Sequence, residues 1–116
     1  MNKAIKETVI LNGELREYNG EAAHFDVPDG IVRIGDWAFA GNTALESVRF
    51  PETLEEIGQM AFYRCKYLRD VRLPRGLKRI GVGAFGRCTS LPELELPEGI
   101  DEVGDHAFDK GEPEDE

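Results

Sequence analysis

The chain has 116 residues, of which 41% are apolar and 32% are charged, a mixture typical of one globular domain that excludes a wholly disordered chain. Its 23 acidic and 14 basic residues give a net charge of −9, which argues against nucleic acid and anionic membranes as partners because both select clustered lysine and arginine. Two cysteines are too few for a disulfide framework.

Residues 1–27 are expected to form an N-terminal cap. Two β-prone runs within residues 8–18 flank Asn12 and Gly13, and Asn-Gly is a strong hairpin signal because both turn positions need a positive φ. Residues 21–27 then read as a lead-in strand. We therefore predict a β-hairpin that covers the open end of a repeat stack.

The N-terminal sequence also bears on localisation. The apolar run at residues 8–11 is shorter than the about 7–15 residues of a signal-peptide core, and no stretch is long enough to span a membrane. We expect a cytoplasmic protein without membrane insertion. A place at the cell surface is expected only if the chain is a domain trimmed from a longer exported one.

A 23-residue unit repeats without a gap through residues 28–108. Proline recurs at 28, 51, 74 and 97, glycine at 35, 58, 81 and 104, and the pair Ala-Phe at 38, 61, 84 and 107. This period, together with the pattern L-x-x-L-x-L, is typical of a leucine-rich repeat solenoid, because one such unit cannot bury its own apolar face. The units are 28–50, 51–73, 74–96 and a partial 97–108.

Each unit predicts the same succession of short elements. The L-x-x-L-x-L run predicts a strand with alternate residues facing outward, and the proline that follows ends it. A second apolar pair predicts a minor strand on the opposite wall. The glycine after it is expected to adopt a backbone conformation closed to other residues, and the Ala-Phe pair to form a single helical turn. The fold class is therefore an α/β-type solenoid of about four coils with a hairpin cap.

Stacking the units in register predicts an interior row of aromatic rings. Equivalent residues of neighbouring coils lie about 4.8 Å apart, the spacing of adjacent strands. The row contains Phe39, Phe62, Phe85 and Phe108. The residue five positions after each proline alternates between basic and acidic from one coil to the next. Opposite charges face each other across the coils only when the coils are in register. This column contains Arg33, Glu56, Arg79 and Glu102.

The C-terminal end lacks an apolar segment that would close the last coil. Residues 109–116 contain no apolar side chain except Pro113 and are expected to form a solvated acidic tail. Two explanations remain open for the exposed edge of the last coil: the charges of the tail deter edge pairing, or this end meets another molecule.

The repeat P-x-G-I/L-x-x-I-G-x-x-A-F-x-x-C-x-x-L-x-x-V/L-x-L over residues 13–108 closely resembles the leucine-rich repeats of the Treponema pallidum and BspA type. The resemblance implies a curved right-handed solenoid with a parallel sheet on one wall and a non-catalytic role in protein–protein contact. Several exported members of that family are surface adhesins. This chain departs from them in having few repeats, in lacking an export signal, and in carrying Asn42 and Gly111 in the column of Cys65 and Cys88.

No motif in the sequence predicts catalysis, a cofactor or a metal. The G-x-G-x-x-G at residues 81–86 consists of repeat positions and is not followed by the helix that a dinucleotide site needs. Cys65 and Cys88 share one column, and we expect buried free thiols. His24 and His106 belong to different walls, and we expect no Ser/His/Asp or Cys/His set to converge. We therefore expect a protein that is not an enzyme.

Two surfaces are candidates for protein binding. The first is the set of outward residues of the strand before each proline: His24, Asp26, Ser47, Arg49, Asp70, Arg72, Glu93 and Glu95. The second lies in the turns and contains Trp37, Met60, Tyr63 and Tyr67. Aromatic residues are common at interaction hot spots, although these side chains could equally pack one coil against the next. A weaker candidate is a small basic column: Gly41, Arg64, Arg87 and Lys110.

We interpret the chain as a protein-interaction module, monomeric or weakly self-associating, whose partner the sequence does not identify. The alternative is a structural repeat unit that assembles with copies of itself, or a fragment of a larger cell-surface adhesin.

Overall fold

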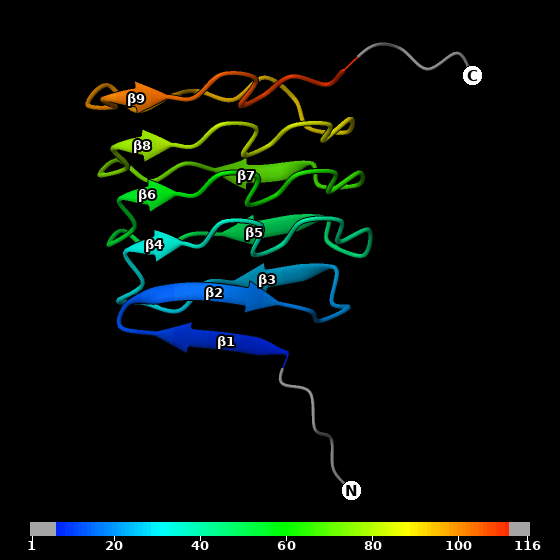
Figure 1. Cartoon of the computed structure of the whole chain (residues 1–116), viewed down its shortest axis with the longest axis horizontal. Coiled ribbons are helices and arrows are strands. Elements are labelled where there is room, and N and C mark those ends of the chain that lie inside the picture. Colours follow the sequence, from blue (N-terminus) through cyan, green and yellow to red (C-terminus); the bar gives the residue numbers. More distant parts are fainter. Residues whose placement is uncertain (1–6, 112–116) are drawn as a thin grey trace, which may run out of the picture.

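The computed structural model describes residues 7–111, which form a solenoid of about four coils (Figure 1). Predictions for residues 1–6 of the cap and for residues 112–116 of the acidic tail lie outside the described residues. In chain order the strands are β1 (Thr8–Leu11), β2 (Glu14–Tyr18), β3 (His24–Asp26), β4 (Arg33–Ile34), β5 (Ser47–Arg49), β6 (Glu56–Ile57), β7 (Asp70–Arg72), β8 (Arg79–Ile80) and β9 (Glu102–Val103).

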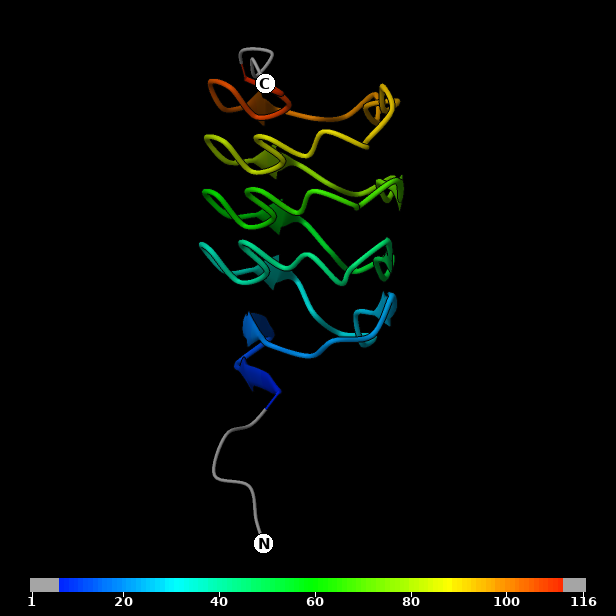
Figure 2. The same ribbon diagram turned by 90° about the vertical axis from the view of Figure 1, so that its right-hand side faces the viewer.

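Two sheets form opposite walls of the coils. Strands β3, β5 and β7 pair in parallel on one wall, and the other wall has the order β1-β2-β4-β6-β8-β9. Phe25 lies opposite Val48, and Val48 lies opposite Val71, so each pairing shifts the chain by one repeat. Figure 2 shows the coils as flat loops stacked on one another. The predicted minor strands, the major strands at β3, β5 and β7, and the register of both sheets are confirmed.

The N-terminal hairpin closes one end of the stack as predicted. Asn12 and Gly13 form its turn with φ of 50° and 80°, and β1 and β2 are antiparallel. The completely buried Leu15 continues the inner column of the second wall. The ring of Tyr18 lies 5.2 Å from that of Phe39, so the hairpin covers the first aromatic ring of the interior.

The Ala-Phe segment forms tight turns instead of the expected single helical turn, and no helix occurs among residues 7–111. In the first coil the Ala38 N–H donates to the Gly35 carbonyl over 3.2 Å, but Trp37 between them has a φ of 63°. A left-handed residue at this point prevents a right-handed helix from starting. The Phe39 N–H donates instead to the Ala61 carbonyl of the next coil over 2.7 Å. The turns therefore form a third hydrogen-bonded connection between coils.

The repeated glycine is required by close packing rather than by a special backbone angle, which corrects the prediction. At Gly81, whose φ is not in the left-handed region, a Cβ would lie 2.7 Å from the backbone nitrogen of Gln59 and 2.8 Å from the carbonyl carbon of Gly58. Only glycine lets two coils approach so closely. One column of positive φ angles occurs two residues later in each coil, at Trp37, Met60, Gly83 and His106.

The interior row of phenylalanine rings is confirmed. Centroids are 4.5 Å apart for Phe39 and Phe62, 5.1 Å for Phe62 and Phe85, and 5.5 Å for Phe85 and Phe108, with planes within 14° of parallel. These separations fall in the range favourable for aromatic pairs. The first three rings are completely or almost completely buried, and Phe108 at the open end is only partly buried.

The repeat at 74–96 lacks the major strand that the sequence pattern predicts. In the repeats at 28–50 and 51–73 the backbone N–H groups of Glu46 and Arg69 donate to the preceding coil at 2.7 and 2.9 Å. The equivalent residue of the repeat at 74–96 is Pro92, which has no N–H to donate. Residues 92–96 follow the same path without strand pairing, so this sheet has three strands and not four.

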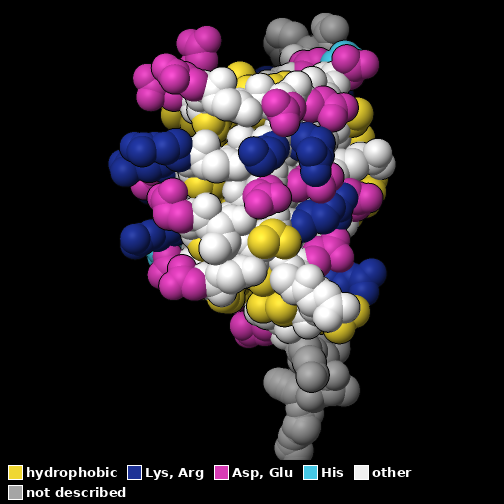
Figure 3. Space-filling model, turned by 90° about the vertical axis from the view of Figure 1, so that its left-hand side faces the viewer, with side chains coloured by type: hydrophobic (Ala, Val, Ile, Leu, Met, Phe, Trp, Pro, Cys, Tyr) yellow, Lys and Arg dark blue, Asp and Glu magenta, His cyan; other side chains and the backbone are white. Residues whose placement is uncertain are grey.

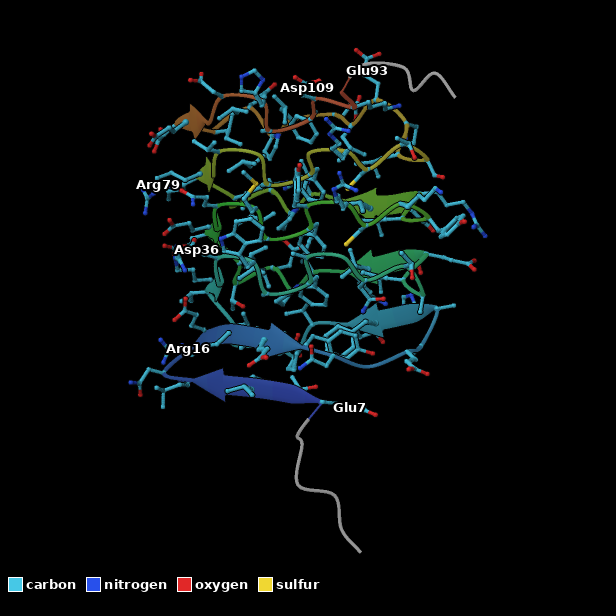
Figure 4. All side chains as sticks on the ribbon, turned by 45° about the vertical axis from the view of Figure 1, so that its right-hand side comes forward. Glu7, Arg16, Asp36, Arg79, Glu93 and Asp109 are labelled. Atoms are coloured by element: carbon cyan, nitrogen blue, oxygen red, sulfur yellow. The ribbon has the colours of Figure 1, made fainter. Side chains whose placement is uncertain are left out.

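The alternating charges on the second wall face one another as predicted. Glu56 lies between Arg33 at 3.4 Å and Arg79 at 3.6 Å, and Arg79 pairs in register with Glu102. Burial opposes the charge of Arg33, but hydrogen bonds to Glu14 and Asp36 and the charge of Glu56 raise its pKa above the ordinary value. Figure 4 shows Arg79 and Asp36 projecting from this wall, far from Glu93 in the last coil.

Candidate functional site

The three-stranded sheet presents the predicted outward residues in two columns, which we call the strand wall. The first column contains His24, Ser47 and Asp70, and the second contains Asp26, Arg49 and Arg72. Glu93 and Glu95 occupy the corresponding positions of the repeat at 74–96, beyond β7, the last strand of this sheet. These side chains are exposed except for the half-buried Ser47, so the wall is open to solvent.

Contrary to expectation, the structure brings a serine, a histidine and an aspartate together on this wall. Nδ1 of His24 is within hydrogen-bond distance of the Ser47 hydroxyl, and its Nε2 lies 2.7 Å from the Asp26 carboxylate. A catalytic triad needs a buried carboxylate and a site shielded from water. Here the side chains of His24 and Asp26 are 54% and 66% exposed on an open sheet face. The set fixes the orientation of His24 but lacks the shielding that nucleophilic catalysis requires.

A groove runs beside the strand wall, where each coil turns at its proline; we call it the proline-corner groove. Its volume is about 1370 Å³, and residues of all four coils line it. One side is the second column of the strand wall, extended by Glu95. The other side is formed by the residues directly after each proline, which are Asp29, Glu52, Arg75 and Glu98. These four residues were not among the predicted binding residues, although they form a column of the repeat as regular as the strand residues.

The second candidate surface combines packing and exposure. Met60 and Tyr63 pack against the next coil, because their side chains fill the space where a Cβ of Gly83 or Gly86 would lie. Trp37 is 52% exposed, and its ring lies 6.0 Å from that of Tyr63 in an edge-on arrangement. Tyr67, the last member of the predicted set, is also exposed, with the Lys66 ammonium 5.6 Å from its ring. Packing against the preceding coil thus explains the G-x-G-x-x-G motif: Gly81 faces its backbone, and Gly83 and Gly86 face the side chains of Met60 and Tyr63.

The basic column places Arg64 and Arg87 on the turn side of adjacent coils. The guanidinium of Arg64 lies 5.8 Å from the Tyr63 ring, and that of Arg87 covers Gly111. Both arginines therefore rest against their own coil or the next one. Because they lie outside the proline-corner groove, substitutions of these two arginines serve as controls for substitutions of the groove arginines.

Cys65 and Cys88 are buried free thiols, as predicted. Their Sγ atoms lie 3.2 and 3.1 Å from the carbonyl oxygens of Phe39 and Phe62 in the preceding coils. Burial raises the pKa of Cys65 to about 12 and that of Cys88 to about 11. In the first coil Asn42 takes this position, and its side-chain oxygen accepts from the N–H groups of Ala44 and Leu45, at 3.0 and 3.1 Å.

These thiols predict a stability loss at alkaline pH. A thiol whose pKa is raised in the folded state stabilises the fold fully below its unfolded pKa, near 9, and this contribution is lost as the pH rises towards 11–12. We expect the free energy of unfolding to fall more steeply between pH 9 and 11 in the wild type than in a Cys65→Ala/Cys88→Ala variant, measured by urea unfolding. Equal slopes would contradict the burial of the thiols.

Within residues 7–111 no three His, Cys, Asp or Glu side chains are grouped so that they could hold a metal ion. The same part of the chain contains no helix with the length and apolarity needed to cross a membrane.

Figure 3 shows basic and acidic side chains side by side across this face of the stack, with only small apolar areas between them. This face therefore offers charged groups rather than a continuous apolar area.

Comparison with known proteins identifies the repeat. The family model of the BspA type leucine rich repeat region matches residues 17–112. A leucine-rich repeat protein of T. pallidum is similar, with 30% identity over 78% of this chain and 45% of that protein and a TM-score of 0.76. No curated protein matches the chain.

Two further solved structures have the same fold. A leucine-rich repeat protein from Bacteroides ovatus is 26% identical, covers 95% of this chain and 33% of its own length, and has a TM-score of 0.76. A leucine rich cell surface protein from Faecalibacterium prausnitzii is 28% identical over 93% of this chain and 34% of its own, with a TM-score of 0.79. The chain thus spans between a third and a half of the length of these three proteins. It belongs to the BspA type leucine-rich repeat family.

Proposed function

We propose that this chain is a non-catalytic protein-interaction module whose binding surface is the strand wall together with the proline-corner groove. The observation that carries the proposal is the pair of regular columns of charged side chains on the strand wall. Within residues 7–111 the buried core consists of apolar residues, so the interior explains the fold without these columns. The open position of the Ser47, His24 and Asp26 side chains supports binding over chemistry.

The size of the wall supports the inclusion of the groove. Three strands of three residues offer only about 140 Å² at the usual strand spacing and rise. A standard interface buries about 800 Å² on each partner. The groove extends the wall along all four coils and adds the charged column after the prolines. A partner that fits both surfaces gains contact area that the wall alone does not provide.

Capture of a partner from a lysate of the source cells tests this proposal. We expect the wild-type protein to retain a partner that an Arg49→Glu/Arg72→Glu variant retains about tenfold less, because opposite charges across an interface control both encounter and release. A Trp37→Ala/Tyr63→Ala variant, changed on the turn side, is expected to retain the partner. Thermal unfolding of each variant provides the folding control. Loss in the turn variant alone would place the site on the other surface.

A specific feature favours self-assembly as a second candidate function. At the open end a cavity of about 490 Å³ is lined by apolar side chains that include Leu91, Leu94 and Phe108. Leu96 and Val103 at this end are 44% and 40% exposed, and β9 is an edge strand. Sedimentation velocity across a concentration series separates the candidates: association that increases with concentration supports assembly, and a constant monomer supports the interaction module.

We further propose the division of the chain into a cap at 1–27, repeats at 28–108 and a tail at 109–116. For localisation, fractionation of the source cells tests the cytoplasmic placement against a place at the surface, the location named for the F. prausnitzii relative.

A further inference from the structure

We propose that the proline-corner groove binds an extended peptide segment whose acidic centre is flanked by basic residues. This inference rests on the proposed function as a protein-interaction module and names the class of partner. It follows from the order of charges along the groove, from arginines that have no internal partner, and from the geometry of the columns.

The groove is positive in its middle and negative at both ends. The groove has four levels, each made of a residue near the end of the strand and the residue after the following proline. The first level contributes two carboxylates, the second and third contribute three arginines and one glutamate, and the fourth contributes two carboxylates. In coil order the residues are Asp26 and Asp29, Arg49 and Glu52, Arg72 and Arg75, and Glu95 and Glu98. A long polyanion such as nucleic acid would meet carboxylates at each end. A short acidic segment between two basic residues meets opposite charges along its whole length.

The three groove arginines are free to bind a ligand. Within residues 7–111 none of Arg49, Arg72 and Arg75 forms an ion pair, whereas Arg33 and Arg79 on the opposite wall do. All three groove arginines are exposed. Free guanidinium groups bind carboxylates with two parallel hydrogen bonds, the strongest geometry available to a charged pair.

The register of the strand wall places like charges together. Arg49 lies directly opposite Arg72 in the parallel pair of β5 and β7. Like charges at directly opposed positions destabilise a sheet. The other wall avoids this arrangement by alternating the sign of its charges, as in Arg33, Glu56 and Arg79. An anionic ligand would remove the repulsion between Arg49 and Arg72. The free energy of its binding is therefore more favourable than that of a single ion pair with an arginine that has no like-charged neighbour.

The spacing of the columns fits an extended peptide. Groove residues of neighbouring coils are separated by about 4.8 Å, and alternate residues of an extended chain by about 6.6 Å. When the peptide is centred on Arg49 and Arg72, the mismatch is about 1 Å at each arginine and about 3 Å at each end, where the long basic side chains of the peptide can reach the carboxylates. Four alternate peptide residues therefore cover the four coils when the peptide lies along the axis of the stack, with acidic residues at the two central positions.

Two peptides with the same composition test the charge order. Fluorescence anisotropy of labelled KSESESK and ESKSKSE, both of zero net side-chain charge, is measured with the whole chain at physiological ionic strength. We expect KSESESK to bind about tenfold more tightly, because only its charges oppose those of the groove. A single-stranded oligonucleotide serves as the alternative anionic probe. Equal affinity for the two peptides, or tighter binding of the oligonucleotide, would overturn the proposal.

Paired variants locate the site. Arg49→Ala/Arg72→Ala is expected to weaken KSESESK binding about tenfold, and Arg64→Ala/Arg87→Ala, which removes two charges from the turn side, by less than about twofold. Equal effects of the two variants would mean non-specific attraction and would overturn the groove assignment. The two peptides could bind with equal affinity while the Arg49→Glu/Arg72→Glu variant still fails to retain the partner captured by the wild type. In that case the peptide inference fails and the proposed interaction module stands. If that capture is also unchanged, both fail.

Discussion

Replacing Phe62 with alanine is expected to lower the free energy of unfolding by about 3–5 kcal/mol, the usual effect of truncating a large core residue. The Phe62 side chain is completely buried, and its ring lies between those of Phe39 and Phe85 at 4.5 and 5.1 Å. The ring of Phe50 contacts it edge-on at 5.8 Å. Truncation leaves a cavity in the middle of the stack that rigid coils on both sides cannot fill. Urea unfolding followed by circular dichroism measures the effect.

Two aromatic residues in less buried positions provide the controls. Phe108 occupies the last place of the same row but is only partly buried, so Phe108→Ala is expected to have a smaller effect than Phe62→Ala. Tyr67 is 48% exposed, and Tyr67→Ala is expected to change stability by less than about 0.5 kcal/mol. A loss below about 1 kcal/mol for Phe62→Ala would mean that the rings are not packed as described.

Gly81→Ala is expected to destabilise the fold by about 3 kcal/mol, at the upper end of the overpacking range. The added methyl group would meet backbone atoms of Gln59 and Gly58 at 2.7–2.9 Å, and no flexible side chain can move away to relieve these contacts. Separating the two coils would lengthen the hydrogen bond of 2.8 Å from the Gly81 N–H to the Ile57 carbonyl. The midpoint of urea unfolding should therefore shift to a lower concentration with little change in slope.

Gly99→Ala is the matched control for this substitution. A Cβ at Gly99 would meet no atom within 4 Å, and its φ lies outside the left-handed region. Alanine at such a position reduces the entropy of the unfolded chain and stabilises by about 0.4–1 kcal/mol. If Gly81→Ala were as harmless as Gly99→Ala, the close approach of the coils would be disproved.

The register of the solenoid was predictable from the sequence because the same residue recurs at the same place in every coil. The period of proline, glycine and phenylalanine defines which residues superimpose, and the charge alternation at Arg33, Glu56 and Arg79 agrees with that alignment. The hairpin was predictable for a local reason, since Asn12 and Gly13 both tolerate a positive φ.

Two errors in the prediction arose from contacts between coils. The regular spacing of the glycines along the chain suggested a special backbone angle, but the constraint on Gly81 comes from the backbone of the neighbouring coil. The Ala-Phe segment was expected to be helical, yet the N–H of its phenylalanine, as at Phe39, donates to the next coil. A third error could have been avoided, because Pro92 stands where the ladder needs an N–H donor and this is readable in the sequence.

The candidate site was only partly predictable. The period placed Arg49 and Arg72 side by side, as the structure confirms. The contact of His24 with Ser47 and Asp26 depends on side-chain orientation, which a repeat pattern does not specify. The groove depends on how the chain turns at each proline and thereby brings Arg75 beside Arg72.

Both the fold and the proposed groove require that equivalent residues of successive coils lie directly over one another. Nuclear Overhauser effects between the methyl groups of Ile34, Ile57 and Ile80, in protein labelled only at isoleucine methyls, measure this most directly. Because these residues pair in register, we predict cross-peaks for Ile34 with Ile57 and for Ile57 with Ile80. We predict none for Ile34 with Ile80, which lie two strand spacings, about 9.6 Å, apart. A direct Ile34–Ile80 cross-peak without the two neighbouring ones would contradict the stack.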